Sequence, residues 1–187
     1  MPPKEKPINA LIGFSFGGNY AIRIGTLEVA QKIKKIIAIC PMVDHETSIA
    51  AMQSPFFKWY YKRKWRKSFK FKENRWPDYD FSEIYKIKDF KSMTAQLLPV
   101  ILPEFENVDD YFHAYKITNE VANKLLAKTT IIAAEDDEVV PVSTFQHLNE
   151  NDQLKILFTR YGGHNGFIEN YKFEDFSIKI AFQEIST

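Results

Sequence analysis

Short apolar runs alternate with stretches of helical periodicity along the chain. The first apolar run covers residues 8–12, and the segment 20–34 that follows has apolar side chains at helical spacing. The next run, residues 35–43, is almost continuously apolar and ends near Pro41, as is typical of a strand buried on both faces of a parallel sheet. The order strand, helix, strand predicts a βαβ unit.

Residues 44–128 break this pattern. They contain helical periodicities and prolines at positions 55, 77, 99 and 103, without a convincing strand. The segment is too long for a simple connection within a compact domain. We therefore expect a helical lid insertion over residues 44–128.

The strand pattern returns at residues 129–134 and again at 154–159. A short helix is predicted between these strands, ending near Leu148, and a closing helix over residues 173–185. Four strands connected through helices predict the α/β class, with a mostly parallel sheet and a lid inserted between the second and third strands.

Composition supports one ordinary domain spanning residues 1–187, because 45% of the residues are hydrophobic and the net charge is only +1. The single cysteine, Cys40, excludes a disulfide within the chain and lies in an apolar run, so we expect a buried thiol rather than a nucleophile. Residues 1–7 lack the apolar region of a signal peptide, and no run of about 18 apolar residues occurs. These features favour a cytoplasmic protein.

The first candidate for chemistry is Ser15, in the string Gly13-Phe14-Ser15-Phe16-Gly17 between a predicted strand and a predicted helix. Small flanking residues allow the sharp turn that holds a nucleophilic hydroxyl at the carboxyl edge of a sheet. The Phe16 N–H would lie at a helix N-terminus, where it can donate to an oxyanion. Glycine-rich turns of this kind also serve close packing or phosphate binding.

Two further candidates follow later strands. Asp136 and Asp137 come after residues 129–134, and His164 comes after residues 154–159. The carboxyl ends of the strands in an open α/β sheet are where ligands bind, so these side chains can converge on Ser15. The order serine, aspartate, histidine is that of the α/β-hydrolases.

Between the two acids we favour Asp137, because residues 137–141 resemble the Asp-x-x-Val-Pro string that follows the acid in many α/β-hydrolases. Asp136 is the alternative. An acidic turn that only caps the next helix is a competing interpretation, and the spacing does not suit a calcium loop. We expect no metal and no cofactor.

The other histidines lack such a setting. His164 stands in a glycine-rich loop at a strand end, which suits an exposed catalytic position. We expect His45, His113 and His147 to be surface or helix-packing residues, since nothing in their sequence context supplies a partner carboxylate and serine at the sheet edge.

Three motifs, at residues 13–19, 134–141 and 163–167, together resemble the YheT-like branch of the α/β-hydrolase superfamily, which includes the plant embryogenesis-associated hydrolases. Residues 90–94 and 109–112 are also similar to that branch, so the resemblance covers about residues 8–185. It implies a carboxylic-ester hydrolase acting on short to medium acyl esters or lipids. Ser15, Asp137 and His164 would be nucleophile, acid and base.

The resemblance is to the C-terminal half of that family. Its members have further N-terminal strands and a His-Gly loop that donates a second oxyanion N–H, whereas this chain begins near the nucleophile strand and contains no His-Gly dipeptide. We therefore expect an N-terminally truncated domain whose partner is the missing half of the fold, with residues 8–12 at an unpaired apolar edge. The alternative function is a catalytically impaired fragment that acts as a lipid-surface or interaction module.

One stretch within the insertion is unusually basic and aromatic. Residues 56–76 contain nine Lys or Arg residues, nine aromatic residues and one acid, Glu73. Aromatic side chains recur at positions 57, 61, 65 and 69, which favours a lid helix packed over the acyl pocket. An interfacial helix resting on anionic lipid is the second interpretation. Nucleic-acid binding is the third, and it is disfavoured because acids outnumber bases by seven in the rest of the chain.

Overall fold

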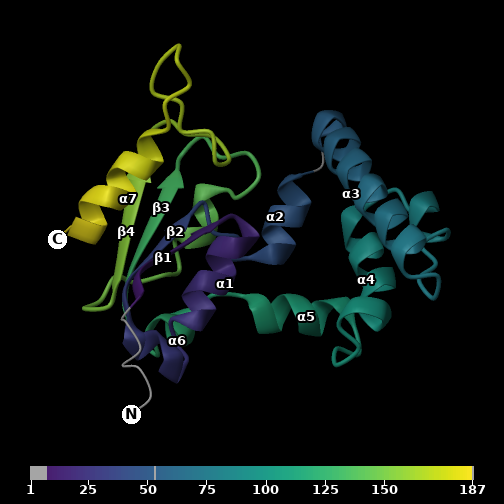
Figure 1. The fold of residues 1–187 in the computed structure, drawn as a ribbon, viewed down its shortest axis with the longest axis horizontal. Coiled ribbons are helices and arrows are strands. Elements are labelled where there is room, and N and C mark those ends of the chain that lie inside the picture. Colours follow the sequence, from purple (N-terminus) through teal and green to yellow (C-terminus); the bar gives the residue numbers. More distant parts are fainter. Residues whose placement is uncertain (1–7, 53, 187) are drawn as a thin grey trace.

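The structure, a computed structural model, describes residues 8–52 and 54–186. Four parallel strands lie side by side in chain order and form one sheet (Figure 1): β1 (Ile8–Phe14), β2 (Ile33–Ile39), β3 (Lys128–Ala134) and β4 (Leu154–Thr159). The predicted α/β class with four parallel strands is confirmed. The N-terminal residues 1–7, on which the prediction about a signal peptide rests, lie outside the described residues.

Helices cover both faces of this sheet. On one face, Ala181 of α7 (Phe176–Ser186) packs with Ile37 and Ile39 of β2. On the opposite face, Ala21 of α1 (Phe16–Ile24) packs with Ile36. Alternate residues of β2 therefore enter two different apolar layers, which explains why this strand is almost continuously apolar in sequence.

The helix predicted over residues 20–34 is too long at its C-terminal end. α1 ends at Ile24, a 3-10 turn covers Glu28–Lys32, and β2 already begins at Ile33. The break follows from Gly25, where a Cβ would lie 2.8 Å from Leu125 and 2.9 Å from Ile36. A larger residue at this position would therefore displace the side chains of Leu125 and Ile36.

Other predicted boundaries shift for similar local reasons. β2 ends at Ile39 rather than residue 43, because Cys40 has a positive φ of 42° and the following Pro41 cannot donate to a ladder. The helix predicted before Leu148 is a 3-10 turn over Val142–Phe145. The closing helix begins at Phe176, after Phe173 with a φ of 59°.

The chain between β2 and β3 contributes helices and loops, and within the described residues it adds no strand to the sheet. Its helices are α2 (His45–Ala51), α3 (Pro55–Arg75), α4 (Phe90–Ile101), α5 (Val108–Tyr115) and α6 (Asn119–Ala122), with a 3-10 turn at Ile84–Lys86. α3 and α4 lie at the opposite end of the molecule from α7 (Figure 1). No helix in the described part of the chain is long and apolar enough to cross a bilayer.

α3 is held by caps and by aromatic packing. The Ser54 hydroxyl accepts a hydrogen bond from the Phe57 N–H at its start. The Phe69 ring stacks on Phe81 with 4.7 Å between centroids, and the Trp65 ring meets Phe90 edge-on at 5.0 Å. The stripe at positions 57, 61, 65 and 69 thus packs inward, as its spacing predicts.

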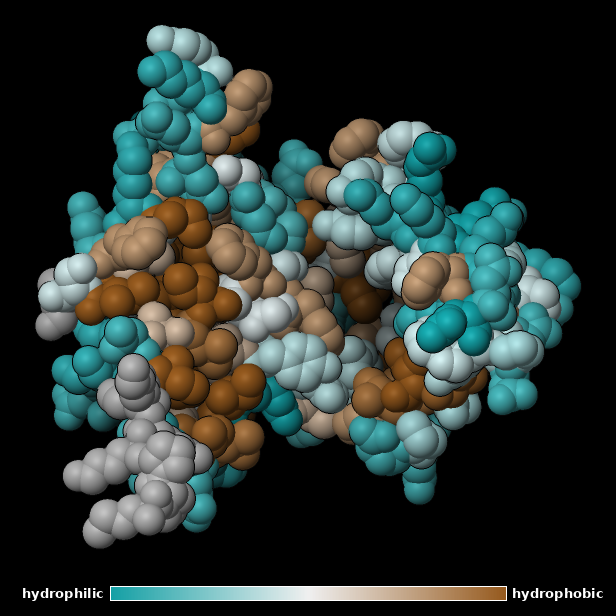
Figure 2. All heavy atoms as spheres, in the orientation of Figure 1, coloured by the Kyte–Doolittle hydropathy of each residue, from teal (hydrophilic) through white to brown (hydrophobic). Residues whose placement is uncertain are grey.

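β1 forms one edge of the sheet. It pairs with β2 on one side, and no described strand pairs with it on the other. Ile8, Ile12 and Phe14 are 47%, 39% and 40% exposed, and Figure 2 shows apolar side chains gathered on the surface over this part of the molecule. Such an apolar edge favours association with another strand.

His45 packs as a helix-packing histidine rather than as a surface one. Its ring is 2% exposed and lies 4.8 Å from the ring of Phe16 and within 6 Å of those of Tyr111 and Tyr115. Neither ring nitrogen has a hydrogen-bond partner among the described residues. Burial in this aromatic cluster lowers the pKa of His45 to about 4.

This burial predicts a pH dependence of stability. In the unfolded chain His45 binds a proton near its ordinary pKa of 6.5, whereas in the folded chain it does so only near pH 4. As the pH is lowered from 6.5 to 4, the free energy of unfolding should therefore decrease by up to about 3 kcal/mol. His45→Phe should flatten this part of a urea-denaturation series. His113→Phe, at an exposed position, should retain the wild-type slope. An unchanged slope in His45→Phe would contradict the prediction.

Candidate active site

Ser15 lies in the turn between β1 and α1. Its backbone has φ 51° and ψ −120°, a strained conformation for a residue with a side chain. Two backbone hydrogen bonds hold it there: its N–H donates to the Ile39 carbonyl at 2.9 Å, and its carbonyl accepts from the Met42 N–H at 3.1 Å. The end of β2 therefore fixes the turn and turns the serine hydroxyl away from the sheet.

The glycines of this turn permit close approach of backbone to backbone. A Cβ at Gly13 would lie 2.3 Å from the Gly17 carbonyl oxygen, and one at Gly18 would lie 2.9 Å from Pro41. Gly17 differs, because a Cβ there would meet nothing within 4 Å. The first glycine of the Gly-x-Ser-x-Gly string is required for the turn, and the second is not required by packing within the described residues.

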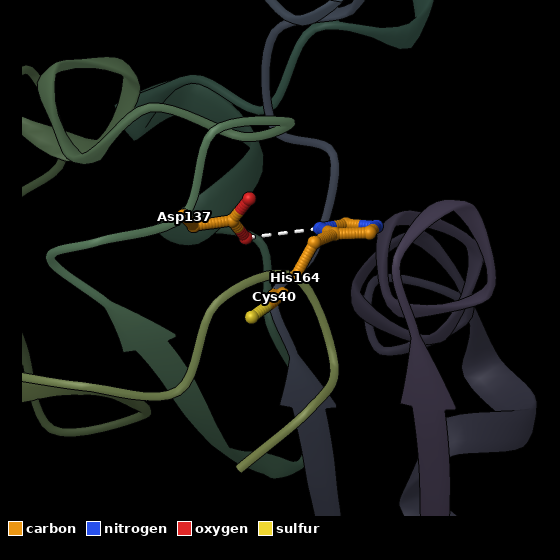
Figure 3. Close-up of side chains that lie close together, drawn as sticks. All are labelled: Cys40, Asp137 and His164. Atoms are coloured by element: carbon orange, nitrogen blue, oxygen red, sulfur yellow. Dashed lines mark hydrogen bonds and ion pairs between the residues drawn. The ribbon is translucent and has the colours of Figure 1, made fainter. Parts of the chain in front are cut away.

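The structure brings together the three side chains that the sequence singled out. The Nε2 atom of His164 lies 2.9 Å from Ser15 Oγ, and its Nδ1 atom lies 2.9 Å from Asp137 Oδ2. In Figure 3 the His164 ring presents Nδ1 to Asp137 and its other nitrogen away from that carboxylate. A hydrogen-bonded chain thus runs from the loop after β3, through the loop after β4, to the turn after β1.

Asp137 is buried, with 5% of the residue exposed. Its Oδ1 atom accepts hydrogen bonds from the N–H groups of Val139 and Val140, both at 2.8 Å, which leaves Oδ2 for His164. Burial acts to raise the pKa of Asp137, but the hydrogen bond and charge of His164 and the two N–H donors outweigh it, so the pKa lies below its usual value. The carboxylate stays ionised near neutral pH.

An ionised Asp137 determines how the histidine is protonated. The carboxylate can only accept, so Nδ1 carries the proton and Nε2 of a neutral ring is left as the acceptor for the Ser15 hydroxyl. This is the tautomer in which a histidine can remove a proton from serine.

Asp136 has a different contact. Its Oδ1 atom accepts a hydrogen bond from the Gly163 N–H at 2.8 Å, one residue before His164. Gly163 and Asn165 on either side of the histidine have positive φ values of 53° and 62°. Asp136 therefore anchors the loop that presents His164, a role that the sequence did not indicate.

Cys40 lies beneath these residues, and its Sγ, Asp137 and His164 have ligand atoms within 4.8 Å of one another (Figure 3). Burial raises the pKa of the Cys40 thiol to about 12, and its S–H lies 3.6 Å from the Gly163 carbonyl oxygen. A metal would need the thiolate, which burial disfavours, and the nitrogen of His164 that already contacts Asp137. The arrangement fits a hydrogen-bonded chain better than a metal centre.

The Phe16 N–H begins α1, and none of the described residues offers it an acceptor in a hydrogen bond. It is one of the helix-terminal donors that intrahelical bonds leave unsatisfied, and the helix dipole favours an anion beside it. Phe16 directly follows Ser15, so its N–H lies beside the hydroxyl of the candidate nucleophile. The N–H of Gly17, the next residue of α1, likewise forms no hydrogen bond with a described residue.

A cavity of about 470 Å³ opens beside Ser15. Val139, His164 and Asn165 line it on the side of the strand loops, and Figure 2 shows the surface hollowed between the sheet and α3. On the side of the insertion it is lined by the aromatic residues Phe56, Phe57, Tyr60 and Tyr61. Ser15, His164 and Asn165 thus lie at one wall of the cavity, and four aromatic rings form the other.

The first turns of α1 carry one more residue that sequence reasoning did not use. Asn19 is fully buried, and its amide donates to the carbonyls of Met42 and Tyr115, both at 2.8 Å. These bonds attach the helix behind Ser15 to the loop after β2 and to the end of α5. In the sequence, the only indication of this role is that Asn19 ends the string Gly17-Gly18-Asn19 of the turn motif.

Comparison with solved structures identifies the fold. An esterase of Pyrococcus furiosus superposes with a TM-score of 0.53 at 20% identity, covering 98% of this chain and 54% of that one. A monoacylglycerol lipase of Paleococcus ferrophilus gives 0.50 at 16% identity, covering 96% and 69%. The chain has part of the α/β-hydrolase fold.

The chain spans about half the length of several of these neighbours: it covers 48% of an acetyl xylan esterase of Thermoanaerobacterium, at 16% identity and a TM-score of 0.45. No protein-family model and no curated protein matches the sequence. At these identities the likeness concerns the α/β-hydrolase fold alone.

The turn glycines give a direct test of the geometry. Gly13→Ala should lower the free energy of unfolding by about 1–3 kcal/mol, because its Cβ would overlap the backbone at Gly17. Gly17→Ala is the matched control and should be neutral or slightly stabilising, since alanine favours a helix and the space is open. Urea denaturation measures both. Equal losses in the two variants would show that the turn does not have this packing.

Proposed function

We propose that this chain is a serine hydrolase of the carboxylesterase and lipase kind, cleaving short to medium acyl esters or lipid esters. The observation that carries the proposal is the hydrogen-bonded chain from Ser15 through His164 to Asp137, with 2.9 Å at each step. The apolar wall of the adjoining cavity supports an acyl substrate. The α/β-hydrolase fold is consistent with it and does not by itself assign an activity.

In the proposed reaction, Ser15 Oγ attacks the carbonyl carbon of the ester while Nε2 of His164 accepts its proton. Asp137 stabilises the imidazolium that forms, and the Phe16 N–H donates to the oxyanion. The tetrahedral intermediate expels the alcohol, which takes the proton from His164 and leaves an acyl-enzyme on Ser15. Water, activated by His164, then releases the acid and restores the serine.

Two finer assignments belong to the same proposal. The motifs around Ser15, Asp137 and His164 support membership in the YheT-like branch of the superfamily. The cytoplasm is the proposed location, supported by the single buried thiol, Cys40.

We also propose that a strand-bearing segment outside the described residues pairs with the free edge of β1 and supplies the second oxyanion donor. Its supports are the exposed Ile8, Ile12 and Phe14, and the greater length of the structural neighbours. In the alternative function, the 187 residues alone lack the donor of that neighbouring segment, have little turnover and act as a lipid-surface or interaction module.

The β1 proposal predicts how the 187 residues behave by themselves. Alone they should associate through the β1 edge and hydrolyse p-nitrophenyl butyrate far below about 1 s⁻¹, because a missing oxyanion donor costs on the order of 10²–10³ in rate. Co-expression with a polypeptide that supplies the neighbouring strand and an N–H donor should restore turnover and a single species in gel filtration. Rapid turnover by a monodisperse 187-residue preparation would contradict this prediction.

Variants of the hydrogen-bonded chain test the catalytic assignment in the complemented protein. Ser15→Ala should abolish labelling by a fluorophosphonate probe, and Asp137→Asn should lower kcat by about 10⁴ through the wrong histidine tautomer. Asp136→Asn is the matched control and should cost far less, because the asparagine oxygen can still accept the hydrogen bond from the Gly163 N–H. Labelling that persists in Ser15→Ala, or a larger loss in Asp136→Asn, would reject the assignment.

A further inference from the structure

α3 carries a second set of aromatic side chains that the inward stripe does not use. Phe56, Trp59, Tyr60 and Phe71 are 63%, 60%, 39% and 66% exposed. Their positions fall on the side of the helix opposite Trp65 and Phe69, which pack against the core. Large aromatic side chains are rarely left in water on one helix face without a partner.

The same side of α3 is strongly cationic. Its exposed residues between the aromatic ones are Arg63, Lys64, Lys67 and Lys70, and we call these eight residues together the outward face of α3. None of the nine Lys or Arg residues of α3 forms an ion pair with a described residue. The positive charge is therefore not neutralised within the described chain.

Glu73, the one acidic residue of α3, does not neutralise the positive charge of the outward face. Glu73 is directed to the neighbouring turn, where its carboxylate accepts hydrogen bonds from the Phe81 N–H and the Tyr85 hydroxyl, both at 2.9 Å. Cations and rings on the outward face are also close to each other: the Arg63 guanidinium lies 6.0 Å from the Trp59 ring, and the Lys64 ammonium 5.5 Å from that of Tyr60.

We propose that the outward face of α3 binds the surface of a bilayer that contains anionic phospholipid. Exposed Trp and Phe side chains enter the boundary between headgroups and acyl chains, and lysine and arginine side chains extend to the lipid phosphates. Charge complementarity favours an anionic bilayer as the partner. Its negative surface attracts all the Lys and Arg side chains of α3, because none of them forms an ion pair with a described residue.

A cavity on the flank of α3 is a candidate binding site for a lipid headgroup. A cavity of about 390 Å³ is lined by Lys62, Arg63 and Arg66 together with apolar and aromatic side chains of α3, α4 and the turn between them. The Lys62 ammonium there donates to the Ile87 carbonyl and forms no ion pair with a described residue, although the charge of Asp89 acts on it from nearby. A lipid phosphate next to these cations would form charge-assisted hydrogen bonds.

This orientation also places the bilayer at the Ser15 cavity. Phe56 and Tyr60 belong both to the outward face of α3 and to the wall of that cavity. An ester with a long acyl chain could then pass from the bilayer to Ser15 along aromatic surface. Only this consequence rests on the proposed hydrolase function; the binding of α3 to a bilayer does not.

Flotation with lipid vesicles in a density gradient tests the proposal on the full 187-residue chain, because protein associated through the β1 edge does not float unless it binds lipid. Binding should be at least about tenfold stronger to vesicles of phosphatidylcholine mixed with phosphatidylglycerol than to phosphatidylcholine alone, and it should weaken as salt is added. Equal binding to both vesicles, or binding that salt leaves unchanged, would overturn the proposal. A single-stranded oligonucleotide that binds more tightly than the anionic vesicles would overturn it as well.

Two variants separate the contributions of the outward face. Trp59→Ser with Phe71→Ser, and Lys64→Glu with Lys67→Glu and Lys70→Glu, should each reduce binding to anionic vesicles by about tenfold or more. The aromatic control is Tyr171→Ser with Phe182→Ser, which are 87% and 64% exposed. Phe182 belongs to α7, which lies at the opposite end of the molecule from α3 (Figure 1). The charge control reverses three exposed lysines away from α3, at positions 34, 128 and 172.

Both controls should bind vesicles as the unaltered chain does, and circular dichroism should show that every variant is folded. Control variants that lose as much binding as the α3 variants would assign the effect to general charge or hydrophobicity and reject the proposal. Fluorophosphonate labelling of Ser15 is measured separately, without vesicles, in the complemented protein. Loss of vesicle binding with labelling intact, or the reverse, therefore distinguishes failure of this inference from failure of the proposed hydrolase function.

Discussion

The parallel alignment of the four strands is the constraint on which the candidate site depends. Phe14 pairs with Ile39 at the ends of β1 and β2, and Ala134 pairs with Thr159 at the ends of β3 and β4. All four strands therefore end at the same edge of the sheet. The loops that follow place a serine, an aspartate and a histidine within hydrogen-bond reach, although residues 15 and 164 are far apart in sequence.

Within that edge, the serine turn and the acid depend on backbone groups more than on side chains. The strained Ser15 backbone is held by Ile39 and Met42, and the buried Asp137 carboxylate by two N–H groups. These bonds offset backbone strain in one case and loss of solvation in the other. Side-chain chemistry at this edge is therefore determined by the ends of strands and by the turns after them.

Features with local causes could be predicted from the sequence. The turn around Ser15 follows from Gly13, and the choice of Asp137 over Asp136 as the contact of His164 follows from the Val-Pro string after it. The end of α1 could not be predicted, because Gly25 lies against Leu125, a residue one hundred positions later in the chain. Burial of His45 likewise depends on aromatic rings of α5, which its own sequence context does not reveal.

The sequence of α3 also predicted only part of its packing. The four-residue spacing identified the inward stripe of α3. The same spacing does not reveal whether the remaining aromatic residues, Phe56, Trp59 and Phe71, are exposed to solvent. The strand loops supply the polar wall of the Ser15 cavity, and α3 supplies the aromatic wall. If both proposals hold, changes in α3 would alter which acyl chain fits and which surface the protein binds, while the hydrogen bonds at the sheet edge would stay as they are.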